Sequence, residues 1–256
     1  MKRIGKITRY LLFVAAMTAA VAACGKKGPL IPPEAMVPAA IKDLRVTQQG
    51  ERFLVTWSQP SREEAGRPLQ GLAGFRLFRR EVLPAGEDCE ECTGAYRLLV
   101  NVDLEYPQGV VRNGSLFSFT DVDLETGKTY QYKIVSFKTD GAESKQSNLA
   151  RRKKVTPPLP PVIAATPSET EITLTWQPVA APPKGSLLGY LVYRGTGDSP
   201  LLSLRKKPFP ETVFEDLGLE RGVKYRYTVT AVAQVEGETV ESDPSAAATG
   251  ELSGRE

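Results

Sequence analysis

The chain reads Leu124-Glu-Thr-Gly127-Lys-Thr-Tyr130-Gln-Tyr132-Lys-Ile134, and the pattern returns as Leu219-Glu-Arg-Gly222-Val-Lys-Tyr225-Arg-Tyr227-Thr-Val229. Both stretches place a leucine and a glycine turn before a run with large residues on alternate positions. Such alternation predicts a β-strand with one buried face. A tyrosine that opens such a strand after a glycine corner is typical of a β-sandwich, where its hydroxyl bonds to upstream backbone.

A longer internal repeat surrounds these two stretches. Each copy has a run that ends in tryptophan, Phe53-Leu-Val-Thr-Trp57 and Ile172-Thr-Leu-Thr-Trp176. A polar loop follows, and then a run with aromatics at matching places, Gly74-Phe-Arg-Leu-Phe-Arg79 and Gly189-Tyr-Leu-Val-Tyr-Arg194. The two halves of the chain therefore encode one structural unit twice.

Each copy opens on a proline-flanked strand, Ile41–Val46 or Pro161–Thr166, and we expect it to close on a serine-rich strand at Ser147 or Ser242. Short alternating strands between turn signals, without a disulfide between sheets, predict an antiparallel sandwich. Over these regions the chain resembles the fibronectin type III family. The resemblance implies an all-β chain with two tandem fibronectin type III-like (immunoglobulin-like) β-sandwiches, at residues 41–155 and 160–250.

The marks of that family occur in both copies. They are Trp57 and Trp176 on the second strand, Phe75 and Tyr190 on the third, and Leu124 with Tyr130 and Leu219 with Tyr225 at the corner. We expect Trp57, Tyr130, Trp176 and Tyr225 to be structural core residues, because a buried aromatic side chain removes a large apolar area from water. Ligand stacking on a tryptophan is the alternative.

Residues 1–23 divide into a basic segment, Met1–Tyr10, and an apolar segment, Leu11–Ala23. Because a membrane span needs about 20 apolar residues, this pattern predicts a signal peptide rather than a lasting membrane helix. The segment ends in Val21-Ala22-Ala23-Cys24, which resembles the lipobox of bacterial lipoproteins. The resemblance implies cleavage before Cys24 and acylation of its thiol. An ordinary signal peptide cut after Ala23 is the alternative.

An acylated Cys24 makes the lipid bilayer the first expected partner. One acyl chain binds a membrane marginally, whereas two or more anchor stably, at about 0.8 kcal/mol per buried CH₂. Gly25 stands where an aspartate would resemble an inner-membrane retention signal. The resemblance thus implies the bacterial outer membrane, with the sandwiches on the periplasmic side or, alternatively, at the cell surface.

Residues 24–40 are rich in proline and glycine, which predicts a semi-extended tether. Its start, Cys24-Gly25-Lys26-Lys27-Gly28-Pro29-Leu30, resembles the mature start of small outer-membrane lipoproteins associated with the lipopolysaccharide-assembly translocon. The resemblance implies a translocon partner. A plain spacer is the alternative, since segments after a lipidated cysteine are often rich in these residues.

The charge balance argues against a nucleic-acid partner. Without residues 1–23 the chain has 29 basic and 30 acidic residues, whereas nucleic-acid binding needs a concentrated basic surface. The basic run Arg151–Lys154 is a local exception, and we interpret it as a solvated linker. The proline-rich segment Lys154–Pro161 predicts a short, stiff spacer between the sandwiches.

The first copy has a longer segment between Phe75 and Tyr130 than the second has between its counterparts, and it contains Cys89 and Cys92. In an oxidising compartment we expect these cysteines to form a local disulfide. Redox activity, unpaired thiols or adventitious metal binding are alternatives. The neighbouring carboxylates lack the spacing of a calcium loop, which favours a solvated acidic loop. They are Glu87, Asp88, Glu90 and Glu91.

The chain contains no histidine, which removes His-based catalysis and His-ligated metals. We therefore expect no enzyme activity, no cofactor and no metal. The sequence predicts a non-catalytic lipoprotein that binds an unidentified envelope protein, with edge strands and residues 80–115 as contact surfaces. Polysaccharide binding, a simple spacer role and translocon assembly are alternative functions, and a redox enzyme is the least favoured.

Overall fold

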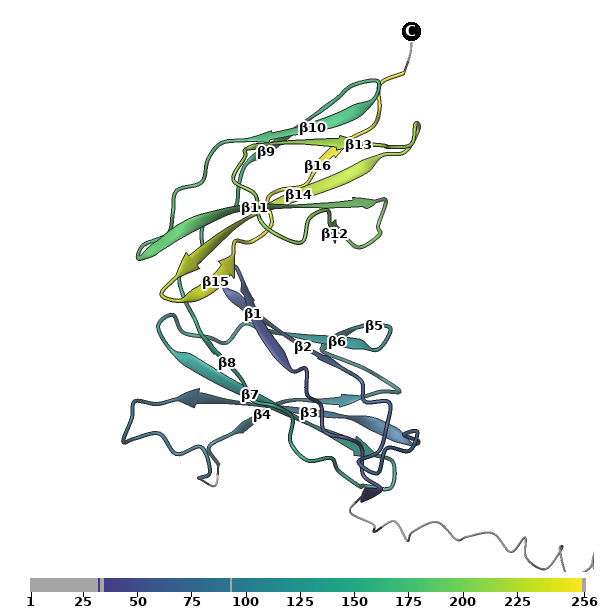
Figure 1. Cartoon of the computed structure of the whole chain (residues 1–256), viewed down its shortest axis with the longest axis vertical. Coiled ribbons are helices and arrows are strands. Elements are labelled where there is room, and N and C mark those ends of the chain that lie inside the picture. Colours follow the sequence, from purple (N-terminus) through teal and green to yellow (C-terminus); the bar gives the residue numbers. More distant parts are fainter. Residues whose placement is uncertain (1–31, 33–34, 93, 255–256) are drawn as a thin grey trace, which may run out of the picture. The chain divides into compact units, whose positions relative to one another are not determined.

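The computed structural model describes residues 32, 35–92 and 94–254 (Figure 1). The chain divides into a unit that ends at Met36 and a compact unit, Val37–Glu256. The second unit contains all the named strands, and the described residues hold no α-helix. The predicted all-β class is therefore confirmed.

The first sandwich runs from β1 to β8. Its strands are β1 (Arg45–Gln49), β2 (Arg52–Ser58), β3 (Leu72–Val82), β4 (Arg97–Asp103), β5 (Val110–Asn113), β6 (Leu116–Asp121), β7 (Thr129–Lys138) and β8 (Ala150–Lys153). One sheet has the order β1-β2-β6-β5, and the facing sheet has the order β4-β3-β7-β8. Neighbouring strands within each of these sheets are antiparallel.

The second sandwich runs from β9 to β16. Its strands are β9 (Ile163–Pro167), β10 (Glu171–Trp176), β11 (Gly185–Thr196), β12 (Leu202–Ser203), β13 (Val213–Leu217), β14 (Tyr225–Val235), β15 (Glu238–Glu241) and β16 (Ala248–Gly250). One sheet has the order β13-β10-β9, and the other joins β12, β11 and β14, with β15 and β16 pairing along β14. Both sandwiches thus have facing antiparallel sheets, and the predicted fibronectin type III-like fold class is confirmed.

Aromatic rings fill the space between the sheets. Trp57 is fully buried, meets Phe75 edge-to-face at 5.7 Å between ring centroids, and stacks on Phe117 at 5.9 Å. In the second sandwich Trp176 meets Tyr190 edge-to-face at 5.3 Å. The two tryptophans therefore occupy equivalent places in two separate cores.

The corner tyrosines make the bond that the sequence predicts. The Tyr130 hydroxyl accepts a hydrogen bond from the Glu125 backbone N–H at 2.9 Å, and the Tyr225 hydroxyl accepts one from Glu220 at the same distance. The glycine before each tyrosine has a positive φ, as at Gly127 (92°), a conformation that side chains disfavour. Glycine and tyrosine together fix the corner.

Each sandwich also holds a cluster in which an arginine and a tyrosine pair with a buried aspartate; Arg79 is buried, and Arg194 is half-buried. The members are Arg79, Asp121 and Tyr132 in the first sandwich, and Arg194, Asp216 and Tyr227 in the second. The tyrosine hydroxyl donates to the carboxylate at 2.8 Å and 2.7 Å respectively, and the arginine donates to both carboxylate oxygens. Burial and the adjacent carboxylate raise the pKa of both phenols. The clusters therefore satisfy buried charges with internal partners.

The predicted serine-rich strands are wrong in detail. Ser147 and Ser242 lie outside the strands, before β8 and after β15 respectively. Their hydroxyls accept hydrogen bonds from the β7 and β14 backbone N–H groups, Ile134 at 3.0 Å and Ala231 at 2.9 Å. In a regular sheet, a backbone carbonyl of the neighbouring strand would accept this hydrogen bond. Here the serine hydroxyl accepts it instead, so the segment runs beside the sheet without being a strand.

A hydrogen-bonded junction joins the two sandwiches. β1 pairs in parallel with β15, with Gln48 opposite Val240. The Gln48 amide group donates to the Val155 carbonyl at 2.7 Å and accepts from the Val155 N–H at 3.1 Å. Val155 and Val240 are buried in one small cluster with Ala233 and Val235. The segment between the sandwiches is thus held by both of them.

The prediction that Arg151–Lys154 is a solvated linker is wrong. Arg152 donates to the Thr239 carbonyl, and the Lys154 ammonium pairs with Glu51 although its side chain is only 1% exposed. Lys153 pairs with Glu236. The charges find partners that lie far away in the sequence, because β8 lies where the two sandwiches meet. These residues are part of the junction.

Candidate functional site

The predicted anchor, Cys24, and the segment up to Leu30 lie outside the described residues. The second unit starts its backbone pairing at Val37, whose carbonyl accepts from the Glu64 N–H at 3.0 Å. The Ala39 N–H donates to the Arg62 carbonyl at 2.9 Å. The end of the predicted tether, residues 37–40, is therefore attached to the first sandwich.

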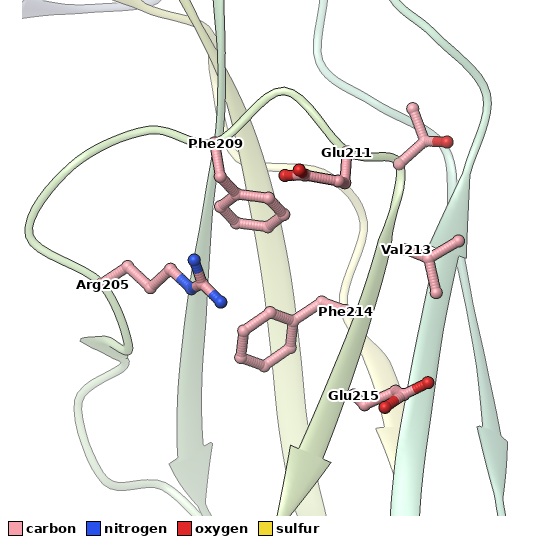
Figure 2. Close-up of a pocket in the computed structure, with 7 residues that line it drawn as sticks. Arg205, Phe209, Glu211, Val213, Phe214 and Glu215 are labelled. Carbon is pink, nitrogen blue, oxygen red and sulfur yellow. The ribbon is translucent and has the colours of Figure 1, made fainter.

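A cavity of about 680 Å³ opens on the second sandwich (Figure 2). It is lined by Arg205 and Phe209, from the connection between β12 and β13, and by residues 211–215, which run into β13. The Arg205 guanidinium carbon lies 4.9 Å from the centre of the Phe209 ring and 5.6 Å from that of Phe214. Figure 2 shows these three side chains pointing toward one another. The cavity therefore combines aromatic walls and one ordered cation with the carboxylates of Glu211 and Glu215.

Residues Arg205, Lys206 and Lys207 form an exposed basic loop beside this cavity. No carboxylate of the described residues lies within ion-pair distance of these three basic side chains. Stacking on aromatic rings orders a guanidinium while its hydrogen-bond donors stay free. The loop thus offers unneutralised positive charge at the mouth of the cavity.

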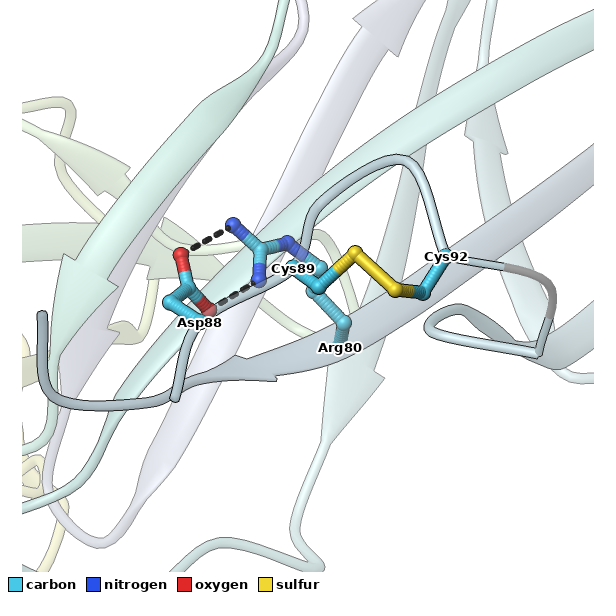
Figure 3. Close-up of a disulfide and its surroundings, with 4 residues drawn as sticks. All are labelled: Arg80, Asp88, Cys89 and Cys92. Atoms are coloured by element: carbon cyan, nitrogen blue, oxygen red, sulfur yellow. Dashed lines mark hydrogen bonds and ion pairs between the residues drawn. A yellow bond between two sulfur atoms is a disulfide. The ribbon is translucent and has the colours of Figure 1, made fainter. Parts of the chain in front are cut away.

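The predicted disulfide loop lies between β3 and β4. Cys89 and Cys92 are joined by a disulfide with a Cα–Cα distance of 5.4 Å (Figure 3). Both residues are exposed. The disulfide closes a very short loop, so its effect is local.

The sequence analysis predicted that the acidic residues of this loop are solvated. In the structure, not all of them face solvent. Asp88 accepts two hydrogen bonds from the Arg80 guanidinium, at 2.5 and 3.1 Å, and Glu90 lies 3.5 Å from the same group. Arg80 is 4% exposed. Hydrogen bonding to Arg80 holds the pKa of Asp88 below its usual range. The carboxylates neutralise an arginine on the face of the sheet, which leaves Glu87 and Glu91 exposed.

Tyr96 completes the contact between the loop and the sheet. Its hydroxyl accepts from the Gln131 side chain at 2.5 Å, and the Lys133 ammonium lies 3.8 Å from its ring centre. The Arg151 guanidinium donates to Gln131 as well. Asp88 and Tyr96 therefore tie the loop to β3 and β7, while residues 83–87 stay exposed. The predicted contact region, residues 80–115, also contains strands β4 and β5.

The remaining predicted site residues are structural. Trp57, Tyr130, Trp176 and Tyr225 are buried, with exposed fractions of 0, 5, 5 and 7%. In the part of the chain that the structure describes, no three acidic or cysteine side chains gather as a metal site would require. Sequence reasoning missed the cavity at Arg205, whose only sequence signal is the cluster Arg205-Lys-Lys207 near two phenylalanines.

Among the described residues, no helix could span a membrane.

No family model matches the chain. Among solved structures, the chain is similar to the crystal structure of the FN1–FN3 domains of chicken CNTN1, with a TM-score of 0.36 and 17% sequence identity. The match covers 85% of this chain and 66% of that chain, so this chain spans just under two thirds of its length. The fold assignment rests on the strand order and not on this likeness.

Proposed function

We propose that this protein is a bacterial lipoprotein, anchored in the outer membrane through an acylated Cys24, that acts as a non-catalytic binding or scaffolding module. The anchor rests on the lipobox-like sequence Val21–Cys24, and the observation that carries the scaffolding role is the junction between the sandwiches. Gln48, Val155 and Val240 couple the two folds through hydrogen bonds and a shared buried cluster. A coupled pair presents its surfaces at a fixed spacing, which suits a scaffold better than a flexible linker does.

The free sheet edges supply contact surfaces for such a module. β5 and β13 each stand at the end of a sheet among the described strands. Val111 on β5 is 69% exposed, and Leu217 on β13 is 61% exposed. An edge strand with exposed apolar side chains is a ready template for another chain.

A non-catalytic role fits the chemistry of the polar groups. The buried ionisable side chains pair with internal partners, as Arg79 does with Asp121 and as Asp216 does with Arg194. The chain has no histidine to act as a general base near neutral pH. These features support binding over catalysis.

The segment Cys24–Leu30 favours one more specific partner, the lipopolysaccharide-assembly translocon, because it resembles the mature start of lipoproteins associated with it. Moving these seven residues onto an inert lipoprotein carrier tests this idea. Recovery of the translocon with the carrier supports it, and loss of the translocon when Gly28–Leu30 are replaced by Ser makes the effect specific.

The test of the main proposal is a pull-down from crosslinked cells, with the tag at the C-terminus. The wild-type chain and a Cys24→Ala variant are compared at matched expression. We expect one envelope complex to be recovered with the wild type and lost with the variant. Equal recovery from both would contradict the anchored-module proposal, and an acylated chain that crosslinks to no protein would favour the spacer alternative.

A further inference from the structure

We propose that the free edge of β13 and the cavity beside it bind an extended segment of a partner protein that carries a carboxylate side chain. This inference rests on the proposed binding function and deepens it, because it names the surface and the chemistry of the partner. Three features carry it: an open strand edge, a cavity along that strand, and a cation that no described carboxylate neutralises.

The first feature is the edge of β13. The strand pairs with β10 on one side and with no other strand among the described residues. Its sequence, Val213–Leu217, contains no lysine or proline, although Glu215 and the buried Asp216 are charges of a kind that also protects edges. Val213 and Leu217 are 48 and 61% exposed. β13 is therefore open to the addition of a strand.

The second feature is the position of the cavity. Residues 211–215 line it, so it follows the beginning of the same strand (Figure 2). When a peptide adds to a sheet edge, backbone hydrogen bonds supply affinity and pockets that take alternate side chains supply specificity. A volume of about 680 Å³ lies within the range of small-ligand pockets and accommodates such a side chain.

The third feature is Arg205. Its guanidinium is stacked on Phe209 and Phe214, and within the described part of the chain it has no carboxylate at ion-pair distance. The planar guanidinium fork matches a carboxylate in a bidentate pair, and an ordered fork loses less entropy on binding. Arg205 thus selects a carboxylate on the partner side chain that enters the cavity.

The acidic residues nearby limit how much negative charge the partner can carry. Glu211 and Glu215 themselves line the cavity, so only one partner carboxylate can be matched to Arg205 there. Glu215 is exposed and alternates along β13 with Phe214 and the buried Asp216. Successive residues of a strand point to opposite faces. A partner residue on the Glu215 face should therefore be neutral or basic, whereas the residue on the Phe214 face is acidic. This pattern favours a single carboxylate in a neutral strand over a polyanion.

The aromatic rings argue against a sugar as the occupant. A sugar ring stacks on an exposed aromatic face, but Phe209 is only 6% exposed and Arg205 covers its ring. Phe214 is half-buried and also meets the guanidinium. The rings order the arginine and leave no free platform.

The test uses the full mature chain in detergent micelles and a defined peptide. The probe is a fluorescent nine-residue peptide of serine, threonine and valine with one central glutamate, and the matched probe has lysine in that place. Anisotropy gives the affinity, and hydrogen–deuterium exchange identifies the protected strand. We expect the glutamate peptide to bind at least about tenfold more tightly, since tenfold is a modest effect for one interfacial charge pair.

Variants separate the charge effect from folding. Arg205→Glu should reverse the preference, so that the lysine peptide binds more tightly. Lys224→Glu, a charge reversal at an exposed lysine that does not line the cavity, should leave both affinities unchanged. Protection from exchange should appear in residues 213–217. A reversed preference shows that the variant is folded and that the site reads charge.

Several outcomes overturn the proposal. One is equal affinity for both peptides, and another is protection from exchange at β5 instead of β13. A third is binding that does not saturate up to about 1 mM, which we take as the limit of specific affinity. The fourth is competition by a glucose hexasaccharide. Protection of residues 213–217 that rises with protein concentration alone would assign the edge to a second copy of the chain. If these results occur while the anchored chain still crosslinks to a partner, the proposed function stands and only this surface is wrong.

Discussion

Replacing Gln48 with alanine should uncouple the two sandwiches. Gln48 is 2% exposed, and its side chain satisfies both the N–H and the carbonyl of Val155, at 3.1 and 2.7 Å. Val155 is itself 3% exposed. The substitution therefore leaves two buried backbone groups without partners and removes a contact to the Gly50 carbonyl.

The expected cost follows from these groups. Each buried polar group that loses its partner costs about 1–3 kcal/mol. Because water can enter at an opened junction and satisfy part of the loss, we expect a total of about 2–4 kcal/mol. This is a large share of the 5–15 kcal/mol that stabilises a typical domain.

The two tryptophans provide the assay, because each reports on one sandwich. Trp176→Phe leaves Trp57 as the probe of the first core, and Trp57→Phe leaves Trp176 as the probe of the second. Urea unfolding followed by fluorescence should give coincident transitions when Gln48 is present. In the Gln48→Ala background, the two transitions should separate and at least one should move to lower urea.

Gln49→Ala is the matched control. Gln49 is the next residue of β1, and its side chain makes only a long contact of 3.4 Å with Arg52. Its replacement should change the free energy of unfolding by less than about 0.5 kcal/mol, because the half-buried Gln49 side chain satisfies no buried backbone group. The reasoning is refuted if Gln48→Ala behaves like this control, or if the two tryptophans report separate transitions even with Gln48 in place.

Three further predictions concern single sites. Trp57→Ala should lower the free energy of unfolding by about 3–5 kcal/mol. Trp57→Phe should lower it much less, because the indole N–H has no hydrogen-bond partner among the described residues. Chemical denaturation measures both values, and equal losses would contradict this prediction. Arg80 lowers the pKa of Asp88, so the loop contact persists as pH falls through the usual aspartate range near about 3.9 and is lost only below it; NMR titration should show this, with the Asp88 pKa rising in Arg80→Gln. Replacing both Cys89 and Cys92 with serine should remove at most about 2 kcal/mol from the free energy of unfolding, given the short loop that the disulfide closes. A catalysed thiol–disulfide exchange assay should give the same background rate for this variant and the wild type, and a lower rate in the variant would favour redox activity.

The sandwich could be predicted because its signals are local and repeated. Alternation around Tyr130 and Tyr225 sets the buried face, and the glycine corner fixes the tyrosine hydroxyl on nearby backbone. Trp57 and Trp176 follow from the same alternation. These features depend on residues a few positions apart, so a single sequence reveals them.

The ion pairs were harder to predict because their partners are distant in sequence. The buried Lys154 pairs with Glu51, and Arg152 donates a hydrogen bond to the Thr239 carbonyl. No local sequence pattern reveals these partners. The buried clusters did leave a signal: Arg79 and Arg194 end matching runs, and Asp121 and Asp216 stand at the same distance before their corner tyrosines. A repeated pair of opposite charges within alternating strands indicates a buried ion pair.

The candidate site was the least predictable part. The cavity at Arg205 depends on how the chain between β12 and β13 folds back onto Phe209 and Phe214, which is a property of the tertiary packing. The acidic loop was misjudged for the same reason, because the partner of Asp88 is an arginine on β3. Loop residues take their roles from the scaffold that surrounds them.

The most direct test of the central claim is the intact mass of the protein extracted from membranes. An anchored module should begin at Cys24 and carry the added mass of a diacylglyceryl group, with or without a further N-acyl chain. Its Cys24→Ala variant should lack that mass and leave the membrane fraction. A wild-type chain that is cut at the same place but carries no acyl mass would contradict the anchor, and with it the proposed location and function.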